Sequence, residues 1–114
     1  MLNSGDVVEL DLGSPQGSEA GFLHPAVVVT AQRILQAEPT VVQVVPLTTT
    51  IRGFGSEVLL QPDDDNRLSH PSAVQCQHIR AVSTRRVDTV LGNIGPVNLT
   101  QIRAVLGLVL DIPT

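Results

Sequence analysis

The chain has 114 residues, of which 42% are hydrophobic and 16% are charged, so it can bury one core and is too short for two ordinary domains. Its formal net charge of -4 argues against the broad basic surface of sequence-specific DNA-binding proteins and large RNA-packaging proteins. Phe22 and Phe54 are the only aromatic residues, which is too few for the base-stacking platform of an RRM or OB fold. We therefore expect residues 1–114 to form a single domain.

Short valine-rich runs, separated by Gly, Pro and Asp, predict strands as far as Val82. Residues 7–11 alternate in a way that predicts a strand with one buried face. Further strands are predicted at 26–30, 41–47 and 57–60, and the first two are apolar enough to be central. Between the strands at 26–30 and 41–47, residues 31–36 predict a short helical turn that ends before Pro39.

The segment 73–82 changes its alternation in the middle. The apolar residues before Gln77 and those after His78 have opposite parity, and a β-bulge near these two residues would reconcile the two halves. Such bulges often aim side chains at a functional site.

The C-terminal segment alone has helical spacing. Asn98 precedes Gln101 by three residues, as in an N-terminal capping motif, and apolar residues then recur on one helical face. Gly107 costs this helix about 1 kcal/mol relative to Ala, so the helix depends on packing against the sheet. The predicted class is mainly β with one closing helix.

Composition also predicts the compartment. No stretch approaches the roughly 20 apolar residues of a membrane helix, and the N-terminus lacks the pattern of a signal peptide. We expect a cytoplasmic protein without membrane contact. The single cysteine, Cys76, forms no internal disulfide and is expected to be a small buried side chain.

Three segments carry residues suited to chemistry. The loop 13–21 is rich in Gly and small polar residues, which fits a binding loop and equally a solvated connection. Pro25 holds His24 in an extended conformation at the start of a strand, where the imidazole is either functional or an incidental surface group.

The third segment, 46–53, places three threonines and Arg52 directly after a buried strand. Hydroxyl groups and a guanidinium at a strand end can hold one phosphate, although a hydroxyl-stabilised turn has the same composition. All seven basic residues are arginines, whose planar guanidinium suits phosphate.

No metal or other cofactor is expected. The carboxylates at 63–65 have the composition of a solvated connection rather than of a cation site. His24, His70 and His78 lack the spacing of zinc ligands.

Taken in order, these segments resemble the MazF/PemK (Kid) toxins over almost the whole chain. The resemblance rests on residues 5–12, 17–19, 24–30, 45–49, 56–58, 76–80 and 92–95. The form of residues 48–53 is especially similar to mycobacterial members.

The resemblance implies a small, twisted, SH3-like or CcdB-like barrel with a C-terminal α-helix, which pairs as a homodimer around an RNA groove. It implies a toxin of a type II toxin–antitoxin system that cleaves single-stranded RNA at short motifs without a metal, the RNA being mRNA, tRNA or rRNA. It also implies a cognate MazE-like antitoxin, whose flexible tail blocks the RNA groove.

The family's catalytic threonine or serine corresponds to Thr48, but its other catalytic residues differ here. The arginine that usually precedes the proline is replaced by His24, and the arginine and aspartate of the Kid branch correspond to Gln75 and Gln77. Either the site is rebuilt around His24, with positive charge from Arg52 or Arg80, or ribonuclease activity is weak or absent.

Chemistry favours the rebuilt site, because histidine acts as a base or an acid near neutral pH and arginine, whose pKa lies far above neutrality, does so only with difficulty. His24, Thr48 and Arg52 are the expected catalytic residues, with Thr48 and Arg52 contacting the phosphate. The expected RNA-binding residues are Ser18, Glu19, Thr49, Gln75, Gln77 and Arg80. The two glutamines would read base edges from one strand face because of their i, i+2 spacing.

Two other functions compete with this one. A non-enzymatic toxin could bind a protein target, as the gyrase-poisoning CcdB proteins do on a related fold, and a small barrel could serve only as a protein-interaction module. The weight on the enzyme comes mostly from the resemblance.

Overall fold

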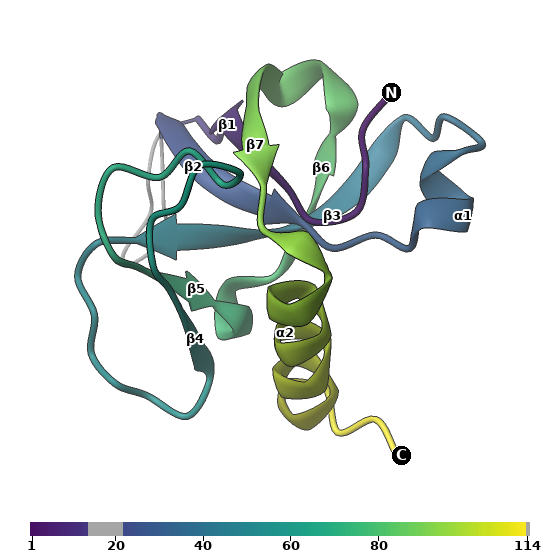
Figure 1. Cartoon of the computed structure of the whole chain (residues 1–114). Helices are drawn as coiled ribbons and strands as arrows, with labels where there is room; N and C mark the ends of the chain where they lie inside the picture. The colour runs from purple at the N-terminus through teal and green to yellow at the C-terminus, as the bar shows by residue number, and fades with distance from the viewer. Residues whose placement is uncertain (14–21, 114) are drawn as a thin grey trace.

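The computed structural model describes residues 1–13 and 22–113, which form a mainly β structure with a C-terminal helix (Figure 1). The elements in these ranges are β1 (Asp6–Asp11), β2 (Leu23–Val28), α1 (Gln32–Leu35), β3 (Val41–Thr48), β4 (Glu57–Leu60), β5 (Ser72–Gln75), the 3-10 turn η1 (Cys76–His78), β6 (Arg80–Ser83), the 3-10 turn η2 (Thr84–Arg86), β7 (Val87–Asn93) and α2 (Gly95–Val109). The predicted fold class is confirmed. Within the described ranges, no helix has both the length and the apolarity needed to cross a membrane.

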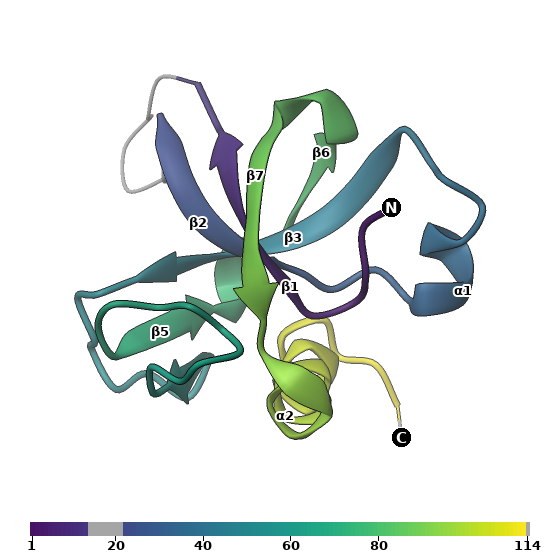
Figure 2. The ribbon, with the colours of Figure 1, turned by 45° about the horizontal axis from the view of Figure 1, so that its top comes forward.

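The strands form one antiparallel sheet in the order β4-β5-β3-β2-β1-β7, with β6 also paired to β3. One edge of β3 pairs with β2, and the other edge pairs with β6 near its start and with β5 near its end. Figure 2 shows β3 crossing the molecule, with β6 and β5 on different sides of its centre. One long, twisted strand therefore connects the two halves of the sheet.

Both faces of the sheet are covered by apolar residues. Successive residues of a strand point to opposite faces, so Val7 enters the core that α2 covers and Val8 enters a second core on the other face. Both side chains are fully buried. The prediction that segment 7–11 buries only one face is therefore wrong.

Strand β2 begins earlier than predicted, at Leu23 rather than at residue 26, because β1 continues to pair with it. His24 lies opposite Leu10, and Pro25 lies opposite Glu9. His24 is thus part of the sheet rather than a residue at the entrance of a strand. The turn predicted at 31–36 is confirmed as α1, and the strands predicted at 41–47 and 57–60 are confirmed as β3 and β4.

The interruption near Gln77 is a 3-10 turn and not a bulge within one strand. The turn η1 separates β5 from β6, and these two strands pair with different parts of β3. The chain must turn between them, which a single extra residue would not achieve.

Strand β7 was not predicted, because its side chains are half-buried or exposed and follow no apolar alternation. It pairs with β1 and leads directly into α2 (Figure 1). Helix α2 begins at Gly95, before the predicted cap at Asn98. Asn93 Oδ1 accepts a hydrogen bond from the Gly95 amide at 2.8 Å, and Pro96 suits the first helical turn.

Cys76 is fully buried beneath α2 in the first core, as predicted. Burial disfavours the thiolate and raises the pKa of the Cys76 thiol to about 11 from an ordinary value of 9.0. The sequence contains no tyrosine and no lysine. Cys76 is therefore the side chain expected to release most protons between pH 9.0 and about pH 11.

Gly92 is required by close backbone packing. A Cβ atom at this position would overlap the Asp65 carbonyl oxygen and lie 2.9 Å from the Asn66 carbonyl carbon. The Asn93 amide donates to the same Asp65 carbonyl at 2.9 Å, so the backbone cannot move aside without losing this bond.

Replacing Gly92 by Ala should lower the free energy of unfolding by roughly 3 kcal/mol or more, because backbone atoms would have to shift. Gly107→Ala is the matched control, since a Cβ there meets nothing within 4 Å and should stabilise α2 by about 0.5–1 kcal/mol. Urea denaturation of both variants measures the difference, and similar stabilities would contradict the packing argument.

Alkaline pH should destabilise the fold through Cys76. Above pH 9.0 the unfolded thiol releases its proton while the native thiol keeps it up to about pH 11, so the free energy of unfolding should fall by up to about 1.4 kcal/mol per pH unit in this window. Cys76→Ala should remove this part of the pH dependence. An unchanged profile in denaturation experiments on the variant would show that another group is responsible.

Candidate functional site

His24 is held by the backbone of the neighbouring strand. The pairing of β2 with β3 ends at Ala26 and Pro46. His24 lies two residues beyond this pair on β2, and Thr48 lies two residues beyond it on β3. The His24 side chain is half-buried, and its Nε2 is hydrogen-bonded to the carbonyl oxygen of Leu47. A carbonyl oxygen only accepts, so Nε2 carries a hydrogen and donates it.

Thr48, the last residue of β3, is also half-buried. Its Oγ1 accepts a hydrogen bond from the Thr50 amide at 3.0 Å, which is a local turn of the kind that threonine favours. This contact uses a lone pair of the hydroxyl oxygen and leaves its hydrogen available. Thr48 therefore can donate a hydrogen bond next to His24.

Arg52 and Thr49 lie in the exposed loop 49–56, between β3 and β4. The structure places this loop directly after Thr48, but among the described residues it shows no hydrogen bond from the Arg52 guanidinium to His24 or Thr48. The Arg52 side chain is exposed, and a guanidinium group can bind an anion.

Glu57, the first residue of β4, fixes the far end of the same loop. Its Oε1 accepts hydrogen bonds from the amides of Arg52 at 3.2 Å and Gly53 at 2.9 Å. Glu57 was not among the predicted site residues. A carboxylate five residues after an arginine in a Gly-rich loop was the available signal, but it does not specify a contact with backbone amides.

Gln75 and Gln77 do not share a strand face by i, i+2 spacing, because β5 ends at Gln75 and Gln77 lies on the turn η1. Gln75 lies opposite Glu57 in the β4–β5 pair. Gln77 is exposed, and its Oε1 accepts a hydrogen bond from the Ser56 hydroxyl at 3.0 Å. The two glutamines are therefore brought to the end of loop 49–56 by different contacts.

Arg80 lines a cavity of about 500 Å³ that reaches β3, the strand that ends at Thr48. The other lining residues are Leu12, Pro46, Gln77, His78, Ile79 and Ala81. Pro46 stands two residues before Thr48 on the same face of β3. The cavity thus brings Gln77 and Arg80 to that face, together with His78, to which the sequence analysis gave no role in binding.

Ser18 and Glu19, the two candidates from loop 13–21, lie outside the described residues.

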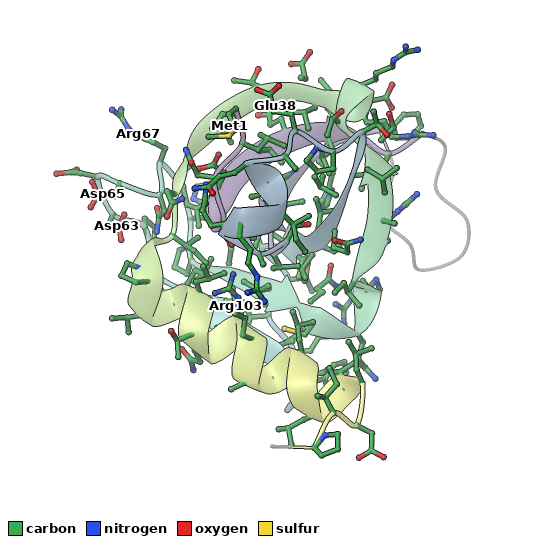
Figure 3. All side chains as sticks on the ribbon, turned by 90° about the vertical axis from the view of Figure 1, so that its right-hand side faces the viewer. Met1, Glu38, Asp63, Asp65, Arg67 and Arg103 are labelled. Carbon is green, nitrogen blue, oxygen red and sulfur yellow. The ribbon has the colours of Figure 1, made fainter. Side chains whose placement is uncertain are left out.

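The carboxylates at 63–65 organise a turn. Asp63 Oδ1 accepts hydrogen bonds from the amides of Asp65 at 2.9 Å and Asn66 at 2.6 Å. Figure 3 shows Asp63, Asp65 and Arg67 projecting outward from this connection. In residues 1–13 and 22–113, no group of three or more His, Cys, Asp or Glu side chains could hold a metal ion.

Comparison with known proteins gives consistent matches over the whole length. Residues 3–110 match the family described as PemK-like, MazF-like toxin of type II toxin-antitoxin system. Endoribonuclease MazF9 of Mycobacterium tuberculosis is 32% identical over 98% of both chains.

Solved structures share the fold. MazF from Deinococcus radiodurans has a TM-score of 0.79 and 26% identity, covering 97% of both chains. A mycobacterial endoribonuclease, solved in complex with its cognate antitoxin, has a TM-score of 0.80 and 24% identity, covering 100% of this chain and 99% of its own.

Proposed function

The chain belongs to the PemK-like, MazF-like family of type II toxin–antitoxin toxins, and from this premise we propose that it is an endoribonuclease that cleaves single-stranded RNA through His24, Thr48 and Arg52. The name of its M. tuberculosis relative, an endoribonuclease, supports this activity over a CcdB-like toxin that binds gyrase. The site assignment rests on the geometry of the described residues.

The observation that carries the proposal is the hydrogen bond from His24 Nε2 to the Leu47 carbonyl. With its hydrogen on Nε2, the neutral ring has its lone pair on Nδ1. The carbonyl therefore selects the tautomer and orients the ring, which is the role that a third group plays for a catalytic base. Because Leu47 precedes Thr48, one stretch of backbone positions both side chains.

In the proposed reaction, Nδ1 of His24 takes the proton of the ribose 2′-hydroxyl, and the 2′-oxygen attacks the adjacent phosphorus. The bond from phosphorus to the 5′-oxygen breaks, and that oxygen takes a proton from a water molecule as it leaves. The protonated His24 then returns its proton to the resulting hydroxide. The products are a 2′,3′-cyclic phosphate and a 5′-hydroxyl end.

The phosphate would be held by two different donors. Thr48 has a hydroxyl hydrogen to offer, since its oxygen already accepts from the Thr50 amide. Arg52 supplies a permanent positive charge to the crowded phosphate as its negative charge is redistributed. The proposed chemistry needs a base, a cation and an acid, and no step in it uses a metal.

We propose that Gln75, Gln77 and Arg80 contact the RNA beyond the cleaved bond. Gln77 presents its amide nitrogen, because its oxygen is occupied by Ser56, and single-stranded RNA exposes base edges to such donors. Thr49, Ser18 and Glu19 complete the proposed set of RNA-binding residues.

The family description implies a protein antitoxin. We propose that an acidic, flexible segment of it competes with RNA for Arg52 and Arg80, because carboxylates and phosphates bind guanidinium groups in the same way. We also propose a homodimer in which both copies contribute to the RNA groove.

Replacing His24 by Ala should lower the cleavage rate by roughly 100- to 10,000-fold, the usual contribution of this kind of proton transfer. The pH profile of the wild-type rate should lose an inflection in the variant, because the proposed base is gone. Cleavage of a single-stranded RNA with mapped 5′ ends provides the measurement.

His24→Gln is the matched control, because its amide nitrogen can still donate to the Leu47 carbonyl but cannot titrate. It should fold with wild-type stability and lack the pH inflection, while His24→Arg should keep some activity with a flattened profile. A wild-type rate and profile in His24→Ala would reduce His24 to a structural residue.

Cleavage should also persist in excess EDTA at the wild-type rate. Loss of activity on chelation and recovery on adding Mg²⁺ would move the chemistry to a carboxylate-bound metal and overturn the assignment of His24 as the base.

A further inference from the structure

We infer that Glu57 is a positioning residue for the cleavage reaction, because its carboxylate holds the loop that carries Arg52 against the sheet. This inference rests on the proposed function. Glu57 itself touches neither His24 nor Thr48 in hydrogen bonds of the structure, so it would act only through the loop.

The contact is with the loop backbone. One carboxylate oxygen accepts from two successive amides, those of Arg52 and Gly53. Hydrogen bonds to an ionised acceptor are about twice as strong as bonds between neutral groups. Gly53 has a φ of +74°, a left-handed conformation that glycine adopts without steric cost.

Four further contacts show that Glu57 is one of several ties on this loop. At the start, Thr48 Oγ1 accepts from the Thr50 amide at 3.0 Å. At the end, the Glu57 amide donates to the Phe54 carbonyl at 3.0 Å, the Ser56 carbonyl accepts from the Cys76 amide at 3.1 Å, and the Ser56 hydroxyl donates to Gln77. Among residues 1–13 and 22–113, Glu57 alone is hydrogen-bonded to the middle of the loop, where Arg52 lies.

The strand that carries Glu57 makes this tie rigid. Glu57 is half-buried and lies opposite Gln75 in the β4–β5 pair, and β5 in turn pairs with β3 at Leu47 and Thr48. The carboxylate is therefore fixed relative to the backbone that orients His24. Through Glu57, the position of Arg52 is set by the same sheet that sets the proposed base.

Fixing Arg52 in this way contributes to the rate because a flexible arginine would have to be ordered in the transition state. Misplacement of a catalytic contact by about 1 Å can cost on the order of 100-fold.

The test is a double-mutant cycle on the full chain, using a short single-stranded RNA that spans the strongest cleavage site of the wild-type protein. Glu57→Ala should lower kcat/KM by roughly 10- to 100-fold. Glu57→Gln keeps a carbonyl oxygen as acceptor and should stay within about threefold of wild type. Glu9→Ala removes a half-buried carboxylate from β1 and should leave cleavage unchanged.

The decisive comparison is made in the background of Arg52→Gln. If Glu57 acts by placing Arg52, adding Glu57→Ala should lower kcat/KM by less than about twofold further, because the positioned group is already gone. Multiplying effects would show that Glu57 supports the fold in general, and a wild-type rate in Glu57→Ala would show no role; either result overturns the inference.

Hydrogen exchange keeps the inference testable if Glu57→Ala does not fold. In the wild-type protein, the amides of Arg52 and Gly53 should exchange at least about tenfold more slowly than that of Gly55. Exchange of all three at the same rate would overturn the inference. A wild-type protein that leaves RNA intact would instead refute the proposed function, which this exchange measurement does not depend on.

Discussion

The structure depends on the pairing of β3 with three other strands. Its eight residues pair with β2 along one edge and with both β5 and β6 along the other. Since β5 and β6 must lie along different parts of one strand, the chain between them has to turn at η1. The same requirement places Gln77 and His78 on a turn beside β3 instead of within a strand.

The candidate site lies at the end of β3, just beyond the last residue that pairs with β2. At Leu47 and Thr48, β3 still pairs with β5, while its other edge offers the Leu47 carbonyl to the imidazole of His24. The His24 side chain takes the place of a strand partner there. The Leu47 carbonyl is therefore hydrogen-bonded to an imidazole, a group that can also carry a proton. The proposed base is thus held by the sheet and requires no separate scaffold.

Much of this arrangement was predictable from the sequence, and the failures have specific causes. The apolar runs of β3 and β4 predicted their positions because burial acts directly on side-chain type. Strand β7 was missed because pairing with β1 is a backbone interaction that its mixed side chains do not reveal. The start of α2 was misplaced because the Asn93 side chain satisfies the Gly95 amide, ahead of the cap that Asn98 suggested.

In the site, residue types and resemblance marked His24, Thr48 and Arg52, but no pattern in the sequence indicates the Leu47 carbonyl or the amides that Glu57 binds.

The contacts of Ser56 have a consequence for how this protein can diverge. Ser56 joins the end of the loop that carries Arg52 to the turn that carries Gln77, through its hydroxyl and through its carbonyl. A substitution that moves Gln77, which is proposed to contact RNA, would also move the end of the loop that carries Arg52, and the reverse holds as well. Changes in RNA sequence preference and in catalytic rate would therefore be coupled. Paralogues that acquire new targets would be expected to change the loop 49–56 and the turn η1 together.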